Sequence, residues 1–191
     1  MSIFSWDVEM MNDDLEILFD AETIEGLVAG LAERISRDYA GRNPVLVGVL
    51  KAAAPFLADL ARALTIPAEM EFVEASSYGS GTASSGMVRI TKDINRDITA
   101  RHLLVVDCIV DTGRTLAAVM ELLRERHPAS VETVVLLDKK GRRVVDVPIR
   151  YIGTEAPDRF LVGYGLDKAQ HYRNLPYIAA VKQEEDLHSA G

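Results

Sequence analysis

The first clear pattern along the chain is a stripe of apolar residues near the N-terminus. These residues recur every three or four positions, at Ile24, Leu27, Val28, Leu31 and Ile35. Apolar side chains at this spacing share one face of a helix, and a glycine after the last of them is a common end signal. The pattern predicts an amphipathic helix that packs one face on a core and ends near Gly41.

Continuous apolar runs then alternate with helical stretches. The run 45–50 is followed at once by a helical stretch over 53–64, in whose first turn Pro55 is tolerated. Further apolar runs cover 70–73, 103–110 and 131–137, and the last two flank a helix that carries Leu116, Val119, Met120 and Leu123. Apolar strands separated by helices are typical of a parallel sheet covered on both faces, so we expect an α/β fold. Ligands of such sheets bind at the carboxyl ends of the strands.

A segment rich in serine and glycine, residues 76–86, interrupts this alternation and has no apolar periodicity. It predicts a long mobile loop. A flexible linker is the alternative, but a chain of 191 residues favours one domain. Long loops inside a compact domain are usually functional, so we interpret the segment as a lid over a site.

Composition and charge limit the classes of partner. Hydrophobic residues make up 48% and charged residues 26%, as in ordinary globular proteins. The net charge of −8 opposes general attraction to nucleic acid or anionic lipid, so we expect neither as a partner. The apolar runs are shorter than the roughly 18 residues of a membrane helix. An anionic ligand would have to be held locally.

The leader and the cysteine content favour a cytoplasmic location. Residues 1–16 are acidic and lack the basic and apolar regions of a secretory signal. Cys108 is the single cysteine and cannot form an intrachain disulfide. The histidines, at positions 102, 127, 171 and 188, have no metal-ligand spacing, and we assign them no role.

The most informative segment runs from Leu103 to Leu116, where an apolar strand ends in acids and turns into a helix. Backbone N–H groups at the start of that helix would be unpaired and suited to a phosphate. Asp107 and Asp111 lie four residues apart, suited to binding sugar hydroxyls and to moving a proton. The alternative is that Asp111 and Thr112 only cap the helix.

This segment, Asp-Cys-Ile-Val-Asp-Thr-Gly-Arg-Thr over 107–115, resembles the phosphoribosyl-pyrophosphate (PRPP) motif of the purine phosphoribosyltransferases. In that motif two acids, two apolar residues and Asp-Thr-Gly-x-Thr follow a buried strand. Three further segments resemble the family in the same order: 49–51 its pyrophosphate loop, 76–82 its lid, and 160–167 with 172–177 its purine-binding end. The resemblance covers roughly 24–181 and is closest to the hypoxanthine-guanine phosphoribosyltransferases.

The resemblance implies a fold, a reaction and an assembly. The fold would be a single domain, 1–191, with a Rossmann-like parallel-sheet core over about 24–155. A small hood would come from the N-terminal leader and about 156–191. The enzyme would join hypoxanthine or guanine to PRPP with Mg2+, giving IMP or GMP and pyrophosphate in purine salvage. It would act as a homodimer or a homotetramer.

The resemblance also implies residue roles on the PRPP side. Asp111 would manage the proton at the purine N7, and Asp107 would bind the ribose and Mg2+. The PRPP phosphate would be held by Thr112, Gly113, Arg114 and Thr115. The remaining roles are Asp167 as a second metal ligand, Lys51 and Arg173 on pyrophosphate, and Ser77 and Tyr78 in the lid.

On the purine side, Lys139 would donate to the exocyclic O6, which favours a keto base over adenine because lysine can only donate. Phe160 would stack on the base, and Leu161 would offer backbone groups to its edge. Each side chain has an ordinary structural alternative. Lys139 and Arg173 would be solvated surface charges, Phe160 a core residue, and Asp167 the partner of a neighbouring lysine.

The sequence departs from the family pattern at three positions. Cys108 replaces the second acid, which would weaken ribose binding, and Lys168 replaces a common aromatic residue. Ala52 replaces a glycine and resists a backbone with positive φ. Cys108 and Ala52 motivate an alternative from another class, a nucleotide-binding regulatory paralogue with little turnover. A xanthine-preferring transferase is a second alternative.

Overall fold

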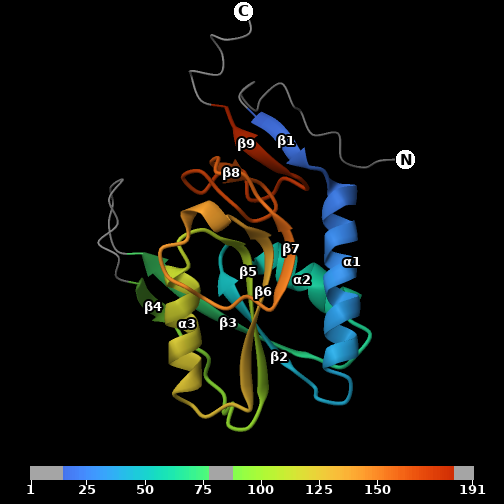
Figure 1. The fold of residues 1–191 in the computed structure, drawn as a ribbon, viewed down its shortest axis with the longest axis vertical. Coiled ribbons are helices and arrows are strands. Elements are labelled where there is room, and N and C mark those ends of the chain that lie inside the picture. The colour runs from blue at the N-terminus through green and yellow to red at the C-terminus, as the bar shows by residue number, and fades with distance from the viewer. Residues whose placement is uncertain (1–14, 78–87, 183–191) are drawn as a thin grey trace, which may run out of the picture.

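A six-stranded sheet forms the centre of the protein in a computed structural model that describes residues 15–77 and 88–182 (Figure 1). The strand order is β4-β3-β2-β5-β6-β7. The parallel strands are β2 (Val45–Leu50), β3 (Glu69–Ser77), β5 (His102–Val110), β6 (Ser130–Asp138) and β7 (Tyr151–Glu155). The predicted α/β fold is confirmed. One edge differs from the prediction, because β4 (Val88–Lys92) pairs antiparallel with β3.

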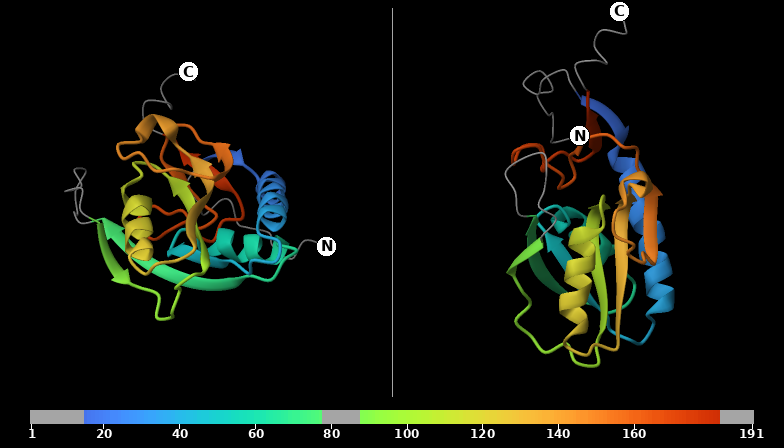
Figure 2. Two further views of the ribbon diagram at one scale, coloured as in Figure 1. Left: turned by 60° about the horizontal axis from the view of Figure 1, so that its bottom comes forward. Right: turned by 60° about the vertical axis from the view of Figure 1, so that its left-hand side comes forward.

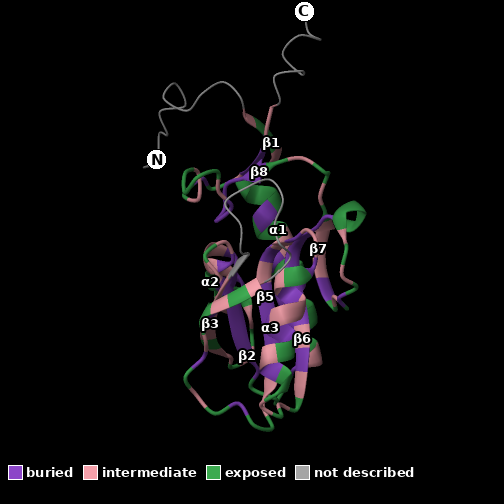
Figure 3. Cartoon of the chain, turned by 90° about the vertical axis from the view of Figure 1, so that its left-hand side faces the viewer, coloured by how far each residue is buried: buried purple, intermediate pink, exposed green. Residues whose placement is uncertain are grey.

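The sheet is covered on both faces, as the continuous apolar runs predict. Helices α1 (Ala21–Asp38) and α2 (Ala54–Ala63) lie on one face, and α3 (Arg114–Arg124) lies on the other (Figure 2). Neighbouring residues of a strand point to opposite faces, so Leu46 and Leu104 join the α1–α2 core while Val45 and Leu103 join the α3 core. Buried residues therefore line the central strands along their length (Figure 3).

Helix α1 begins at a polar cap. The Asp20 side chain accepts a hydrogen bond from the Thr23 N–H at 2.8 Å, which satisfies one of the unpaired donors at the helix start. The helix buries the predicted stripe except Leu27, which is partly buried against the same core. Among the described residues, no helix is long and apolar enough to cross a membrane.

A second, three-stranded sheet lies above the carboxyl ends of the central strands (Figure 1). Its order is β1-β9-β8, formed by Leu15–Phe19, Ile178–Val181 and Leu161–Val162. Strands β1 and β9 pair antiparallel, and an ion pair joins Arg159 to Glu16. The strands of this sheet come from the N- and C-terminal segments that the family resemblance assigned to the hood, while the boundaries near 24 and 155 stay a prediction.

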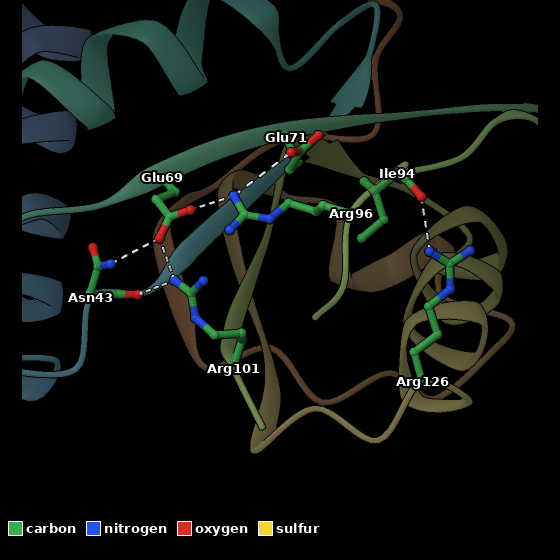
Figure 4. A network of polar contacts seen from close by, with 7 residues as sticks. All are labelled: Asn43, Glu69, Glu71, Ile94, Arg96, Arg101 and Arg126. Atoms are coloured by element: carbon green, nitrogen blue, oxygen red, sulfur yellow. Dashed lines mark hydrogen bonds and ion pairs between the residues drawn. The ribbon is translucent and has the colours of Figure 1, made fainter. Parts of the chain in front are cut away.

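A polar network fastens the opposite end of the sheet (Figure 4). Glu69 at the start of β3 accepts hydrogen bonds from Arg101 at 2.6 Å and from Asn43 at 2.9 Å, and it pairs with Arg96. The two arginines, Arg101 first and Arg96 second, lower the pKa of Glu69 to about 2. Arg126 donates to the Ile94 carbonyl at 2.9 Å. The network holds the connection between β4 and β5 against the bottom of the sheet.

Candidate active site

The turn between β5 and α3 presents the phosphate-binding segment predicted from the sequence. Gly113 precedes α3 with a φ of 83° and without a side-chain cap for the helix. The alternative that Asp111 and Thr112 cap this helix is therefore wrong. The first N–H groups of α3 stay available to an anion. They adjoin a cavity of about 110 Å³ that is lined by Asp107, Asp111, Thr112 and Thr115, among others.

Glycine is required in this turn for two reasons. A φ of 83° lies in the left-handed region that favours glycine, and a Cβ there would lie 2.7 Å from the Val145 carbonyl oxygen. The Thr112 carbonyl also accepts hydrogen bonds from the N–H groups of Val144 and Val145, each at 3.1 Å. The segment after β6 thus packs directly on the phosphate-binding turn and fixes its shape.

A larger cavity of about 480 Å³ lies beside it at the carboxyl ends of β2, β3 and β5. It brings together five of the predicted site residues: Lys51, Asp107, Thr115, Asp167 and Arg173. Glu74 of β3 also lines the cavity, although no pattern in the sequence pointed to this residue. The predicted location at the carboxyl ends of the strands is therefore where these groups meet.

Asp167 and Arg173 form an ion pair on the wall of this cavity. Arg173 Nη2 lies 2.8 Å from Asp167 Oδ1, and the Gln170 N–H donates to Asp167 Oδ2 at 2.9 Å. Arg173 Nη1 donates to the Gly165 carbonyl at 2.7 Å. Arg173 is thus anchored rather than free in solvent, and Asp167 pairs with Arg173 instead of with its neighbour in the sequence.

The loop that follows β2 packs against the segment around Gly165, which leads to Asp167. A Cβ on Gly165, where φ is 96°, would lie 2.1 Å from the Ala52 carbonyl oxygen, so the two backbones are in close contact. The peptide bond between Leu50 and Lys51 is cis. Ala52 is not among the residues with positive φ, so the expected conflict between alanine and a left-handed backbone does not arise.

Asp107 and Cys108 point to different surroundings. Asp107 lines both cavities, its Oδ1 accepts a hydrogen bond from the Cys108 N–H at 2.8 Å, and burial raises the pKa of this carboxyl to about 7. The Cys108 side chain is fully buried in the core, where Sγ lies 3.7 Å from the Tyr164 carbonyl oxygen. Burial raises the pKa of this thiol. Cys108 lines neither cavity, which removes the motive for expecting weaker ribose binding.

Asp111 lies next to two cations. Lys139 Nζ is 3.9 Å from Asp111 Oδ2 and donates to the Arg159 carbonyl at 2.8 Å. Lys139 is only 7% exposed, so the alternative of a solvated surface charge is wrong. On the other oxygen, Arg142 Nε lies 3.0 Å from Asp111 Oδ1. Arg142 is a residue that the sequence reasoning missed, because one cation in the run Lys-Lys-Gly-Arg-Arg carries no signal of its own.

The remaining purine-side residues differ in burial. Phe160 is 53% exposed, so it is not the core residue of the alternative interpretation. Leu161 is buried in β8 and pairs with Ala180, which leaves only backbone groups for a ligand. In the predicted lid, Ser77 is the last residue of β3, and Tyr78 lies outside the described residues.

The parallel sheet and its strand-end phosphate turn are those of a phosphoribosyltransferase. Residues 14–169 match the family described as the phosphoribosyl transferase domain. The hypoxanthine-guanine phosphoribosyltransferase of Streptococcus pneumoniae is 44% identical over 91% of this chain and 96% of its own length. The chain belongs to the hypoxanthine-guanine phosphoribosyltransferase family, which confirms the resemblance seen in the sequence.

Other relatives agree in sequence and structure. The hypoxanthine phosphoribosyltransferase of Haemophilus influenzae is 42% identical over 92% of this chain and 100% of its own length. A crystal structure of a hypoxanthine phosphoribosyltransferase from Staphylococcus aureus has a TM-score of 0.87 and 41% identity, covering 92% of this chain and 96% of that one. The chain also matches the bifunctional protein TilS/HprT of Listeria monocytogenes at 44% identity, but it spans only 27% of the length of that protein.

Proposed function

We propose that the protein transfers the 5-phosphoribosyl group of PRPP to a 6-oxopurine, hypoxanthine or guanine, and releases pyrophosphate. One observation carries the choice of base: Lys139 Nζ and Asp111 Oδ2 lie 3.9 Å apart beside the phosphate-binding turn. The O6 and N7 atoms of a 6-oxopurine are neighbours on one edge of the base. Lysine donates only, so it matches O6, and a carboxylate accepts, so it matches a protonated N7.

The reaction that we infer forms one bond and breaks one. Purine N9 attacks the anomeric carbon of PRPP while the bond to pyrophosphate breaks, and Asp111 takes the proton from N7. The N-terminus of α3 with Thr112 and Thr115 would hold the 5-phosphate, and Asp107 would accept hydrogen bonds from the ribose hydroxyls. Lys51 and Arg173 would stabilise the charge that develops on the leaving pyrophosphate.

The residues present fit a magnesium ion. Asp107 and Asp167 line the same cavity, and Mg2+ is typically held by one or two carboxylates together with substrate phosphates. When bound, the ion would neutralise charge on the pyrophosphate. Asp167 is already oriented by Arg173 and by the Gln170 N–H, so its carboxylate is held on the wall of the cavity.

The test is product detection with PRPP, Mg2+ and each of hypoxanthine, guanine, xanthine and adenine. We expect a nucleoside monophosphate from hypoxanthine or guanine, and its loss when the metal is chelated. Formation of product from xanthine alone would reassign the substrate. Absence of product from every base at high enzyme concentration would contradict the proposal and favour a nucleotide-binding regulator.

Assembly and location are further parts of the proposal. We infer a homodimer or a homotetramer in the cytoplasm. Cys108 is the single cysteine of the chain and is a free thiol, which suits a reducing compartment. A hypoxanthine phosphoribosyltransferase of Trypanosoma cruzi, 40% identical with a TM-score of 0.81, was studied for the role of its C-terminal region in oligomeric state and activity. Light scattering of the purified protein would give the number of subunits.

A further inference from the structure

We propose that Arg142 is a positioning residue that fixes the Asp111 carboxylate for proton transfer and couples it to the purine-stacking segment. The inference rests on the proposed function, because it concerns the same reaction. Arg142 itself would contact neither the base nor PRPP. It would act through Asp111, and this distinguishes it from the residues assigned above.

The two oxygens of Asp111 have different surroundings. Oδ1 is shielded from solvent and accepts no hydrogen bond within the described part of the chain. Its contact is an ion pair with the Arg142 guanidinium, whose Nε lies 3.0 Å away. Oδ2 lies toward Lys139, at 3.9 Å from Nζ. With Oδ1 engaged by Arg142, the carboxylate cannot rotate without giving up an ion pair. Oδ2 is therefore kept toward the position of the base.

The other end of the guanidinium reaches the purine side. Arg142 Nη1 lies 3.0 Å from Asp158 Oδ1, and Asp158 precedes Phe160 by two residues. Lys139 Nζ binds the Arg159 carbonyl in the same segment. Residues 158–160 are thus linked to Asp111 in two ways. Asp158 is linked through Arg142, and the Arg159 carbonyl is linked through Lys139, which lies next to Asp111. A shift of the stacking residue would move the proton acceptor with it.

The local backbone explains why Arg142 can bridge the two acids. It ends the short 3-10 helix η2 (Lys140–Arg142), in which the Arg142 N–H donates to the Lys139 carbonyl at 3.1 Å. The neighbouring cations have other partners: Arg143 pairs with the buried Asp138, and Lys140 pairs with Glu155. Lys140 is 62% exposed and lies in the same helical turn, so it offers a control with the same loss of charge.

The experiment compares R142Q with K140Q in steady-state assays with hypoxanthine and PRPP. We expect R142Q to lower kcat by about 10- to 100-fold, the scale of a misplaced catalytic group, with the KM for PRPP within about twofold. K140Q should match the wild type. R142K should restore part of kcat, since it returns a cation. In the D111N background, R142Q should change kcat by less than about twofold, because its target is already lost.

If R142Q and K140Q have equal kcat values and the wild-type enzyme is active, the proposed role of Arg142 is wrong while the proposed function stands. A further large loss of kcat in D111N/R142Q relative to D111N would also overturn it, because Arg142 would then act independently of Asp111. A wild-type enzyme that forms no nucleotide from any purine would overturn the proposed function, and this inference with it. D158N should give a smaller decrease in kcat than R142Q, and an unchanged kcat would contradict the link to the stacking segment.

Discussion

The carboxylate of Asp111 has a cation at each oxygen, so its substitution tests proton transfer with little change in shape. We expect Asp111→Asn to leave PRPP affinity largely intact and to lower kcat by roughly 10²-fold or more, the usual scale for a residue that moves a proton. Calorimetry with PRPP and initial rates with hypoxanthine measure the two quantities. Near-normal turnover would show that Asp111 has only a structural role.

Lys139 allows a separate test of base selection. Lys139→Gln keeps a donor, adds an acceptor and removes the charge. The contact with a 6-oxo group should weaken by about 1.5–3 kcal/mol, the range for hydrogen bonds to charged groups, while adenine should be penalised less. The ratio of kcat/KM for hypoxanthine to that for adenine measures the effect. An equal change for both bases would place the selectivity elsewhere, on backbone groups near Leu161.

Single residues were predictable where a motif fixed their neighbours. The apolar strand, the acids at its end and the helix start together predicted Asp107 and Thr115, and both residues line the two cavities. Lys139 gave no local sign that its side chain is buried, and only the family resemblance singled it out. Arg142 and Glu74 were missed because an isolated ion pair or a side chain at a strand end leaves no periodic trace in a sequence.

At the scale of elements, the turn between β5 and α3 gives the next prediction. Gly113→Ala would place a Cβ 2.7 Å from the Val145 carbonyl in a left-handed backbone that costs non-glycine residues roughly 1–2 kcal/mol. We expect a lower Tm and weaker PRPP binding, because the turn must move. Thermal unfolding and calorimetry measure these effects.

Gly26→Ala is the matched control for this substitution. Gly26 lies within α1, and a Cβ there would meet nothing within 4 Å. Alanine should stabilise the helix by roughly 0.5–1 kcal/mol and leave PRPP affinity unchanged. If Gly113→Ala matched this behaviour, the turn would not depend on glycine.

The buried elements were easier to predict than the edges. Strands β2, β5 and β6 are covered on both faces, so their apolar runs stand out in the sequence. Strand β4, Val-Arg-Ile-Thr-Lys, lies at an edge and alternates apolar with polar residues, and β8 has only two residues. Such strands are defined by their partners, which a single sequence does not show.

At the scale of the whole molecule, Glu69 links β3 to the connection before β5 and gives a pH prediction. Its pKa falls from an ordinary value of 4.5 to about 2, first because of Arg101 and then because of Arg96. A lowered pKa means that the stabilisation is present above pH 4.5 and is lost as the pH falls from 4.5 toward 2. Glu69→Gln should lower the Tm at neutral pH, and this difference from the wild type should shrink over that interval.

Circular dichroism melts of both proteins between pH 7 and pH 2 check this, within the reversible range. Glu33→Gln, at an exposed position of α1, is the control for loss of one carboxylate. A Tm difference between Glu69→Gln and the wild type that stays constant with pH would show that Glu69 stabilises the fold through packing rather than charge.

The pairing of Leu15 with Val181 brings the two ends of the described chain side by side, so residues 15–181 form a nearly closed ring. A linker between β1 and β9 could complete that ring, and a cut in the turn after α3, over 125–129, would open it at the end of the sheet away from the cavities. Each strand would keep its neighbours in such a circular permutant, and joining two segments that already lie side by side is usually tolerated. The permutant should fold and retain metal-dependent product formation in the same assay. The arrangement of the elements in space would then matter for the enzyme more than their order along the chain.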